Sequence, residues 1–206
     1  MTRLAPPIMP TQFQINDGDG YRDLRLISED GTNRLTLELV RNLADALLEM
    51  WADAKPLIVH GNERFFSAGA DLSEIQALNA SEAFAFAKAG QRLMSAIAQF
   101  PAPVYAAIRG YCMGGGLDLA LACHRRIAAP NAVFGHRGVA LGLVTGWGGT
   151  QRLPRLVGKS CALAMFVAAE KLHAQQARTI GLIDTIAEDP LTEASRRIQL
   201  ASIELC

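Results

Sequence analysis

The chain has 206 residues, half of them hydrophobic, and its 20 basic residues are balanced by 20 acidic ones. A chain of this size can bury one substantial core, so we expect a single globular domain. The charge balance argues against electrostatic capture of nucleic acid or of an anionic membrane. Because no apolar run is long enough to span a bilayer or to form a signal peptide, we expect a cytoplasmic protein without a membrane segment.

The cysteines and histidines show no paired or metal-binding spacing. The four cysteines stand mostly in apolar surroundings, at positions 112, 123, 161 and 206, and the four histidines are dispersed. We therefore expect buried thiols in a reducing compartment rather than disulfides, and no metal site.

Strand-like and helix-like segments alternate along the chain. Residues 1–20, rich in Pro, Gly and Asp, are expected to be a flexible N-terminal segment. Strand patterns cover 21–27, 56–60, 104–109, 126–129 and 182–187. Helical patterns cover 33–51, 79–100, 115–123, 147–157, 160–169, 174–180 and about 191 to the end. Asn79 with Glu82 predicts a capping box at the start of the second helix. The alternation predicts an α/β fold with largely parallel strands.

Two of the strands each lead into a run of small residues followed by a helical pattern. The first run is Phe66–Leu72 (FSAGADL) and the second is Gly110–Asp118 (GYCMGGGLD). Glycine lets the backbone approach a ligand closely, and a helix that begins there directs free N–H groups at that ligand. Two such turns can hold one developing negative oxygen, which is an oxyanion hole. The alternative interpretation is that both turns serve only packing.

Other catalytic motifs are not supported. Gly158-Lys159-Ser160 resembles the end of a phosphate-binding loop, but Leu153 stands where that loop needs glycine. The glycine triplet at 114–116 does not form GxGxxG, and the chain contains no GxSxG. Cys112 has no histidine near it in sequence, so we interpret it as a core residue rather than a nucleophile.

Four segments carry a resemblance to a known family: residues 66–72, residues 110–123, GWGGTQRLPRLVG at 146–158, and AQQA at 174–177 followed by GLID at 181–184. Together they resemble the crotonase (enoyl-CoA hydratase/isomerase) superfamily. The motifs occur in the family's order and spacing over roughly residues 20–190. The resemblance implies a crotonase-like spiral of ββα units with helices packed around it. This core domain would cover 21–190, with a short C-terminal helix over 191–206. Family members generally continue through further helices that cover the acyl pocket and contribute to trimer packing.

The resemblance also implies the ligand and the assembly. The substrate would be an acyl-CoA thioester of the kind used in fatty acid metabolism, with no cofactor besides the coenzyme A of the substrate. A homotrimer or hexamer is expected. Ala68 and Gly115 would supply the two N–H donors of the oxyanion hole, and the segment Ala68, Gly69, Ala70 and Asp71 would line the bound CoA. Loss of one such donor typically costs on the order of 3 kcal/mol in the transition state.

The proton chemistry departs from the family pattern. The hydratases of the family that this chain resembles share two glutamates that hold a water molecule, one acting as base and one as acid. The corresponding positions here are Asp118, which is one methylene shorter, and Gly138, which has no acid. The sequence therefore does not predict a two-carboxylate hydration mechanism. We expect an isomerase-like reaction in which Asp118 alone shuttles a proton between carbons of an enoyl-CoA.

Three alternatives stay open. The chain can be a hydratase whose water is held by Asp118 alone or with His136, or a catalytically impaired relative that binds acyl-CoA or serves assembly. The third alternative is chemistry like that of the naphthoate synthases, which also resemble this chain in having glycine at the position of Gly138. In some of them an exogenous bicarbonate acts as the base.

Two smaller departures from the family pattern are His124, in place of a usual aspartate, and Ser73, in place of a frequent basic residue.

Overall fold

The computed structural model describes residues 12–203. Residues 1–11, part of the expected flexible segment, and residues 204–206 lie outside it. The largest sheet of the protein has six strands, and all neighbouring strands in it run parallel except for the hairpin of β1 and β2. In spatial order they are β1 (Phe13–Asp17), β2 (Arg22–Leu26), β4 (Leu57–His60), β7 (Val104–Ile108), β9 (Arg125–Ala128) and β12 (Thr185–Ile186). β1 lies within the segment expected to be flexible, so that segment is ordered from Phe13 onward.

Two smaller sheets complete the strands. One has the order β11 (Leu172–His173), β10 (Val133–Gly135), β8 (Tyr111–Met113) and β5 (Phe65–Ser67), and the other pairs β3 (Arg34–Leu35) with β6 (Gly69–Ala70). The chain steps from the large sheet to the four-stranded one three times, from β4 to β5, from β7 to β8 and from β9 to β10. Helices follow each step, which confirms the spiral of ββα units.

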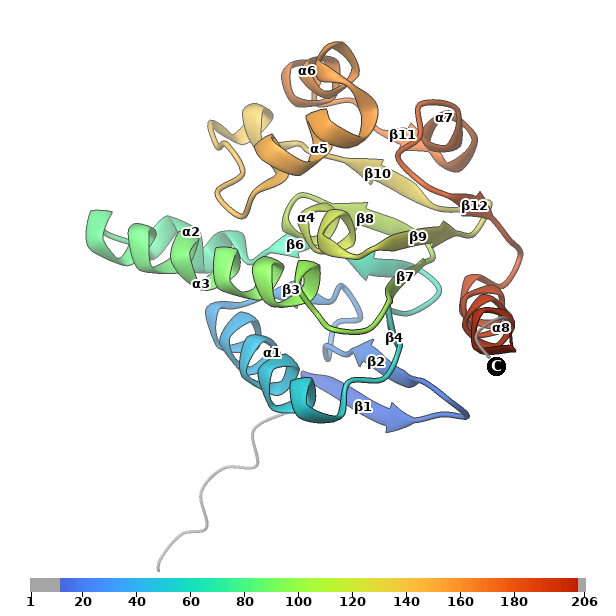
Figure 1. Cartoon of the computed structure of the whole chain (residues 1–206). Helices are drawn as coiled ribbons and strands as arrows, with labels where there is room; N and C mark the ends of the chain where they lie inside the picture. The colour runs from blue at the N-terminus through green and yellow to red at the C-terminus, as the bar shows by residue number, and fades with distance from the viewer. Residues whose placement is uncertain (1–11, 204–206) are drawn as a thin grey trace, which may run out of the picture.

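The helices lie around these sheets, with α4 in the middle of the molecule (Figure 1). They are α1 (Leu37–Glu49), α2 (Leu72–Ala77), α3 (Ala80–Ala98), α4 (Gly115–Ala122), α5 (Gly149–Val157), α6 (Lys159–Ala168), α7 (Ala174–Thr179) and α8 (Pro190–Ile203), with short 3-10 helices η1 (Met50–Asp53) and η2 (Gly138–Leu141). The capping box of Asn79 and Glu82 is confirmed at the start of α3. The helix expected from residue 33 begins later, because Thr36 caps α1 and residues 34–35 form β3.

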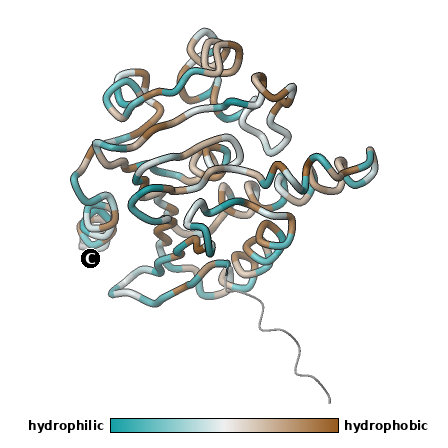
Figure 2. The backbone as a smooth tube through the Cα atoms, turned by 180° about the vertical axis from the view of Figure 1, so that it is seen from behind, coloured by the Kyte–Doolittle hydropathy of each residue, from teal (hydrophilic) through white to brown (hydrophobic). Residues whose placement is uncertain are grey.

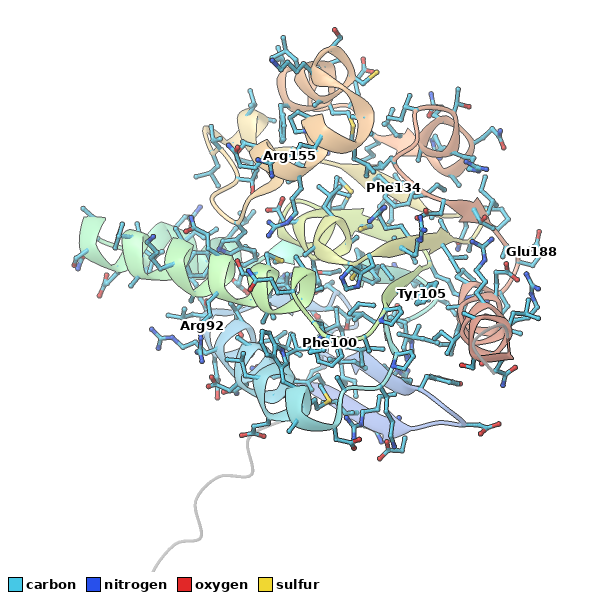
Figure 3. All side chains as sticks on the ribbon, viewed as in Figure 1. Arg92, Phe100, Tyr105, Phe134, Arg155 and Glu188 are labelled. Atoms are coloured by element: carbon cyan, nitrogen blue, oxygen red, sulfur yellow. The ribbon has the colours of Figure 1, made fainter. Side chains whose placement is uncertain are left out.

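The core lies between the sheets and the helices. Figure 2 shows hydrophobic stretches, in brown, running through the inner part of the molecule among paler and teal ones. Phe66 and Phe134 are fully buried, and burying one such side chain stabilises the fold by about 1.5–3 kcal/mol. Figure 3 labels Phe134 and Phe100 in the interior, with Arg92 and Glu188 toward the outside. Across residues 12–203, no helix has the length and apolar character needed to cross a membrane.

Candidate active site

The N-terminus of α4 forms the centre of the site. Gly114, with φ of 51°, caps this helix in a conformation that favours glycine, and its N–H donates to the Gly135 carbonyl at 2.9 Å. Gly115 is the first helical residue, so its N–H has no acceptor within the helix. This N–H and the positive end of the helix dipole are therefore available to an oxygen that gains negative charge.

The second turn runs beside α4 through β6. The Ala68 N–H, expected from the sequence to be the second donor, already donates to the Thr32 carbonyl at 2.9 Å. The Asp71 N–H donates to Leu35 of β3 at 3.3 Å. The positive φ of Gly69, 98°, interrupts the alternation of N–H directions after Ala68. Because Ala70 and Asp71 are successive strand residues and the Asp71 N–H faces β3, the Ala70 N–H faces away from β3. The Ala70 nitrogen lies 3.2 Å from the point that a Cβ on Gly115 would occupy, so the structure brings Ala70, rather than Ala68, to the free N–H of α4.

The residues Asp118, His136 and Thr145 meet one helical turn after Gly115. Asp118 and His136 are 1% and 4% exposed, and Asp118 Oδ1 lies 3.1 Å from His136 Nε2. The Thr145 hydroxyl donates to the other oxygen, Oδ2. Despite their closeness, Oδ1 and Nε2 are not aligned as a hydrogen bond, and neither has another hydrogen-bonding partner among the described residues.

This pair of buried polar atoms is unusual because burial of unpaired polar atoms is costly. The same two atoms can accept or donate a proton, and a water or a substrate group within reach of both would satisfy them. Asp118 and His136, singled out in the sequence, are thus brought together. Thr145 was not predicted, since it lies 27 residues from Asp118 and no local pattern marks it.

Gly138 leaves no room for a second carboxylate. A Cβ at this position would lie 2.6 Å from the Leu143 carbonyl oxygen, so the backbone of the turn excludes a side chain. The segment that follows β10 therefore contributes His136 to the site, and no acid from position 138.

Arg152 and Cys112 complete the surroundings of Asp118. Burial lowers the pKa of the Arg152 guanidinium, while the nearby charge of Asp118 opposes this effect. The guanidinium donates to the Trp147 carbonyl at 3.1 Å and so ties α5 to the preceding loop. Burial raises the pKa of the Cys112 thiol well above its usual value, as expected for a core residue and not for a nucleophile.

The remaining positions singled out in the sequence have structural partners. Asp71 caps α2 by accepting from the Ser73 N–H at 2.8 Å, so Ser73 serves this cap. His124 Nδ1 accepts from the Val104 N–H at 2.8 Å and joins the start of β7 to the end of α4. Residues 12–203 contain no group of three or more side chains placed to hold a metal ion.

Comparisons with known proteins agree with this architecture. The model of the enoyl-CoA hydratase/isomerase family matches residues 24–201. A probable enoyl-CoA hydratase of Bacillus subtilis is 42% identical over 174 residues, which are 83% of this chain and 67% of that protein. Pseudomonas aeruginosa DspI superposes with a TM-score of 0.86 at 30% identity, over 94% of this chain and 74% of DspI. An enoyl-CoA hydratase from Bacillus anthracis superposes with a TM-score of 0.82 at 31% identity, over the same shares of each chain. The chain therefore belongs to the enoyl-CoA hydratase/isomerase family.

Proposed function

We propose that the protein adds water to a 2-enoyl-CoA, using Asp118 and His136 as its acid/base pair. The observation that carries this proposal is the approach of Asp118 Oδ1 to His136 Nε2, 3.1 Å apart and both without another hydrogen-bonding partner among the described residues. Hydration needs two proton-transferring groups at one point, and this site has two. The reaction needs no cofactor beyond the coenzyme A of the substrate.

The oxyanion hole in this proposal consists of the N–H groups of Ala70 and Gly115. Gly115 begins α4 and so has no acceptor for its N–H within that helix, and the Ala70 nitrogen of β6 lies beside it, 3.2 Å from the point that a Cβ on Gly115 would occupy. The thioester oxygen gains charge when its α-carbon becomes enolate-like, and two fixed donors stabilise that charge more than the neutral carbonyl. The segment of Ala68, Gly69 and Asp71 next to Ala70 is proposed to line the CoA.

The steps balance as an addition across one double bond. The oxygen of water bonds to C3 of the enoyl group while one member of the Asp118–His136 pair takes its proton. The electron pair of the double bond moves onto the thioester oxygen, which the two N–H groups hold. The other member then gives a proton to C2, and the thioester carbonyl forms again. General acid/base groups of this kind typically contribute about 10²–10⁴-fold to the rate.

The second candidate is the one-base isomerisation expected from the sequence. It is favoured by Gly138, where the backbone excludes a side chain and so leaves Asp118 without a second carboxylate. In this reaction Asp118 removes a proton from C2 of a 3-enoyl-CoA and returns it to C4. Such a path needs neither water nor His136.

The two candidates are separated by the His136→Gln variant. Purified wild-type protein receives crotonyl-CoA in one assay and 3-hexenoyl-CoA in another, and absorbance of the conjugated enoyl thioester is followed. We expect wild type to consume the crotonyl signal and His136→Gln to do so at least about a hundredfold more slowly. Equal hydration rates in both proteins would remove His136 from the mechanism. A signal gained only from 3-hexenoyl-CoA would identify an isomerase, and binding without turnover of either would favour the impaired relative.

We also propose a homotrimer or hexamer in the cytoplasm. The family resemblance supports this assembly, and so do exposed apolar side chains on η2, on α6, which contacts it, and on the loop between β10 and α5. They are Val139, Leu141, Val144, Leu163 and Val167. Their contact with a second copy would remove this surface from water.

A further inference from the structure

Trp147 fills the space between α3 and the N-terminus of α4. It is only 3% exposed, although it follows a loop whose residues are largely exposed. Its indole Nε1 donates to the Phe86 carbonyl of α3 at 3.3 Å, and the Phe86 and Trp147 rings lie 5.1 Å apart at their centroids. Gly90 of α3 makes room for the ring, because a Cβ at that position would collide with the indole.

The opposite edge of the indole lies against the oxyanion hole. A Cβ on Gly115 would come within 2.5 Å of Trp147 Cζ3, so the ring is in contact with the backbone that carries the proposed donor. The same loop contacts Asp118 through Thr145 and Gly149. Residues 145–149 therefore line the substrate from its thioester carbonyl to its reacting carbons, if the proposed function holds.

From the thioester carbonyl beside Gly115, the acyl group must extend in a different direction from the CoA. CoA is proposed to follow β6 and the start of α2, on one side of Gly115. On the side of α3, the space between Phe86, Gly90 and Gly115 is filled by the indole. A long acyl tail that extended in this direction would have to displace a buried, hydrogen-bonded ring.

We propose that Trp147 is a specificity-determining residue that limits the substrate to short acyl groups. The indole fills the space between α3 and α4, so short chains fit beside it and longer chains do not. Truncation of the ring would free that space. This inference rests on the proposed acyl-CoA substrate and says which members of that class are accepted.

The test is calorimetric binding of butyryl-CoA and decanoyl-CoA, which are saturated and do not require turnover. We expect wild type to bind butyryl-CoA at least about tenfold more tightly, since one methylene in an apolar pocket already gives about 10–200-fold discrimination. Trp147→Ala should shift the affinity ratio toward decanoyl-CoA by at least about tenfold. Phe84→Ala, which removes an exposed ring from the same helix α3, should leave the ratio unchanged.

The outcomes separate this inference from the proposed function. An unchanged ratio in folded Trp147→Ala would overturn the role of Trp147 and leave the acyl-CoA substrate in place. Failure of the wild type to bind either thioester would overturn the proposed function and this inference with it. If Trp147→Ala does not fold, Trp147→Phe provides the measurement, and its smaller ring should shift the ratio in the same direction by a smaller factor.

Discussion

Asp118, the proposed proton-transfer group, is held in place by its neighbours. Its Oδ2 accepts from the Thr145 hydroxyl, which fixes the carboxylate, and its Oδ1 remains beside His136. Gly149 has to be glycine at this point, because a Cβ would collide with the same carboxylate. The backbone at the start of α5 thus lies directly against the Asp118 carboxylate.

A second buried charge, Arg126, has a structural role away from the site. Its guanidinium donates to the Leu182 carbonyl at 2.9 Å and to the Cys123 carbonyl at 2.7 Å, and it lies 3.5 Å from the Asp184 carboxylate. Burial lowers the pKa of this guanidinium, and Asp184 opposes the effect. Arg126 therefore ties the end of α4 to the segment that leads into β12.

We expect Arg126→Met to lower the free energy of unfolding by about 3 kcal/mol, the low end of the cost of breaking a buried ion pair. The variant leaves two carbonyl oxygens and part of the Asp184 charge unpaired in the interior. Urea denaturation measures the change.

Arg125→Met is the matched control, because Arg125 contacts the same carboxylate at 3.1 Å from an exposed position. It should cost less than about 1 kcal/mol. Equal losses in the two variants would contradict the structural role of Arg126.

At the scale of elements, α8 is stabilised by ion pairs between side chains of its first turns. Glu193 accepts from Arg196 and Arg197, and these hydrogen bonds lower the pKa of its carboxyl from 4.5 to about 2. Because the folded pKa lies below the unfolded one, this interaction stabilises the fold fully above pH 4.5 and is lost as the pH falls to about 2.

The Glu193→Gln variant should therefore be less stable than wild type at pH 7, and the difference in unfolding free energy should disappear between pH 4.5 and about 2. Denaturation at a series of pH values measures it. A difference that stays constant down to pH 2 would show that the carboxylate charge of Glu193 does not contribute.

Most of the longer elements follow from the sequence, and several of the short ones do not. α3 has both a helical apolar pattern and its own capping box, so its N-terminus could be placed to within a residue. β3, β6 and β11 have two residues each, too few to show an alternating pattern. They exist because neighbouring turns of the spiral offer them backbone partners, and this information is not local.

At the scale of the whole molecule, the site is assembled from segments far apart in sequence. The proposed roles of Gly115 and Asp118 could be inferred from the sequence because a glycine run and an acid share one helix start. The choice of Ala70 over Ala68 depends on how β6 pairs with β3, and the contact of Trp147 with Gly115 depends on how the loop before α5 folds over α4. Neither can be inferred from spacing along the chain.

The same dependence explains the change of proposed reaction. From the sequence, Gly138 removes the second acid and points to one-base isomerisation. In the fold, His136 reaches Asp118 from the end of β10, and this approach is why we propose it as the second proton-transferring group. The spiral brings β8 and β10 side by side in parallel, which places the residues after both strands at the same edge of the sheet.

The most direct test of the account is the Asp118→Asn variant, which preserves the shape of the side chain and removes its proton-accepting charge. Crotonyl-CoA turnover and butyryl-CoA binding are measured on the same preparations of variant and wild type. We predict at least about a hundredfold loss of turnover in Asp118→Asn, with butyryl-CoA affinity within about twofold of wild type. Equal turnover in the two proteins would contradict the assignment of Asp118 and, with it, the proposed acid/base pair.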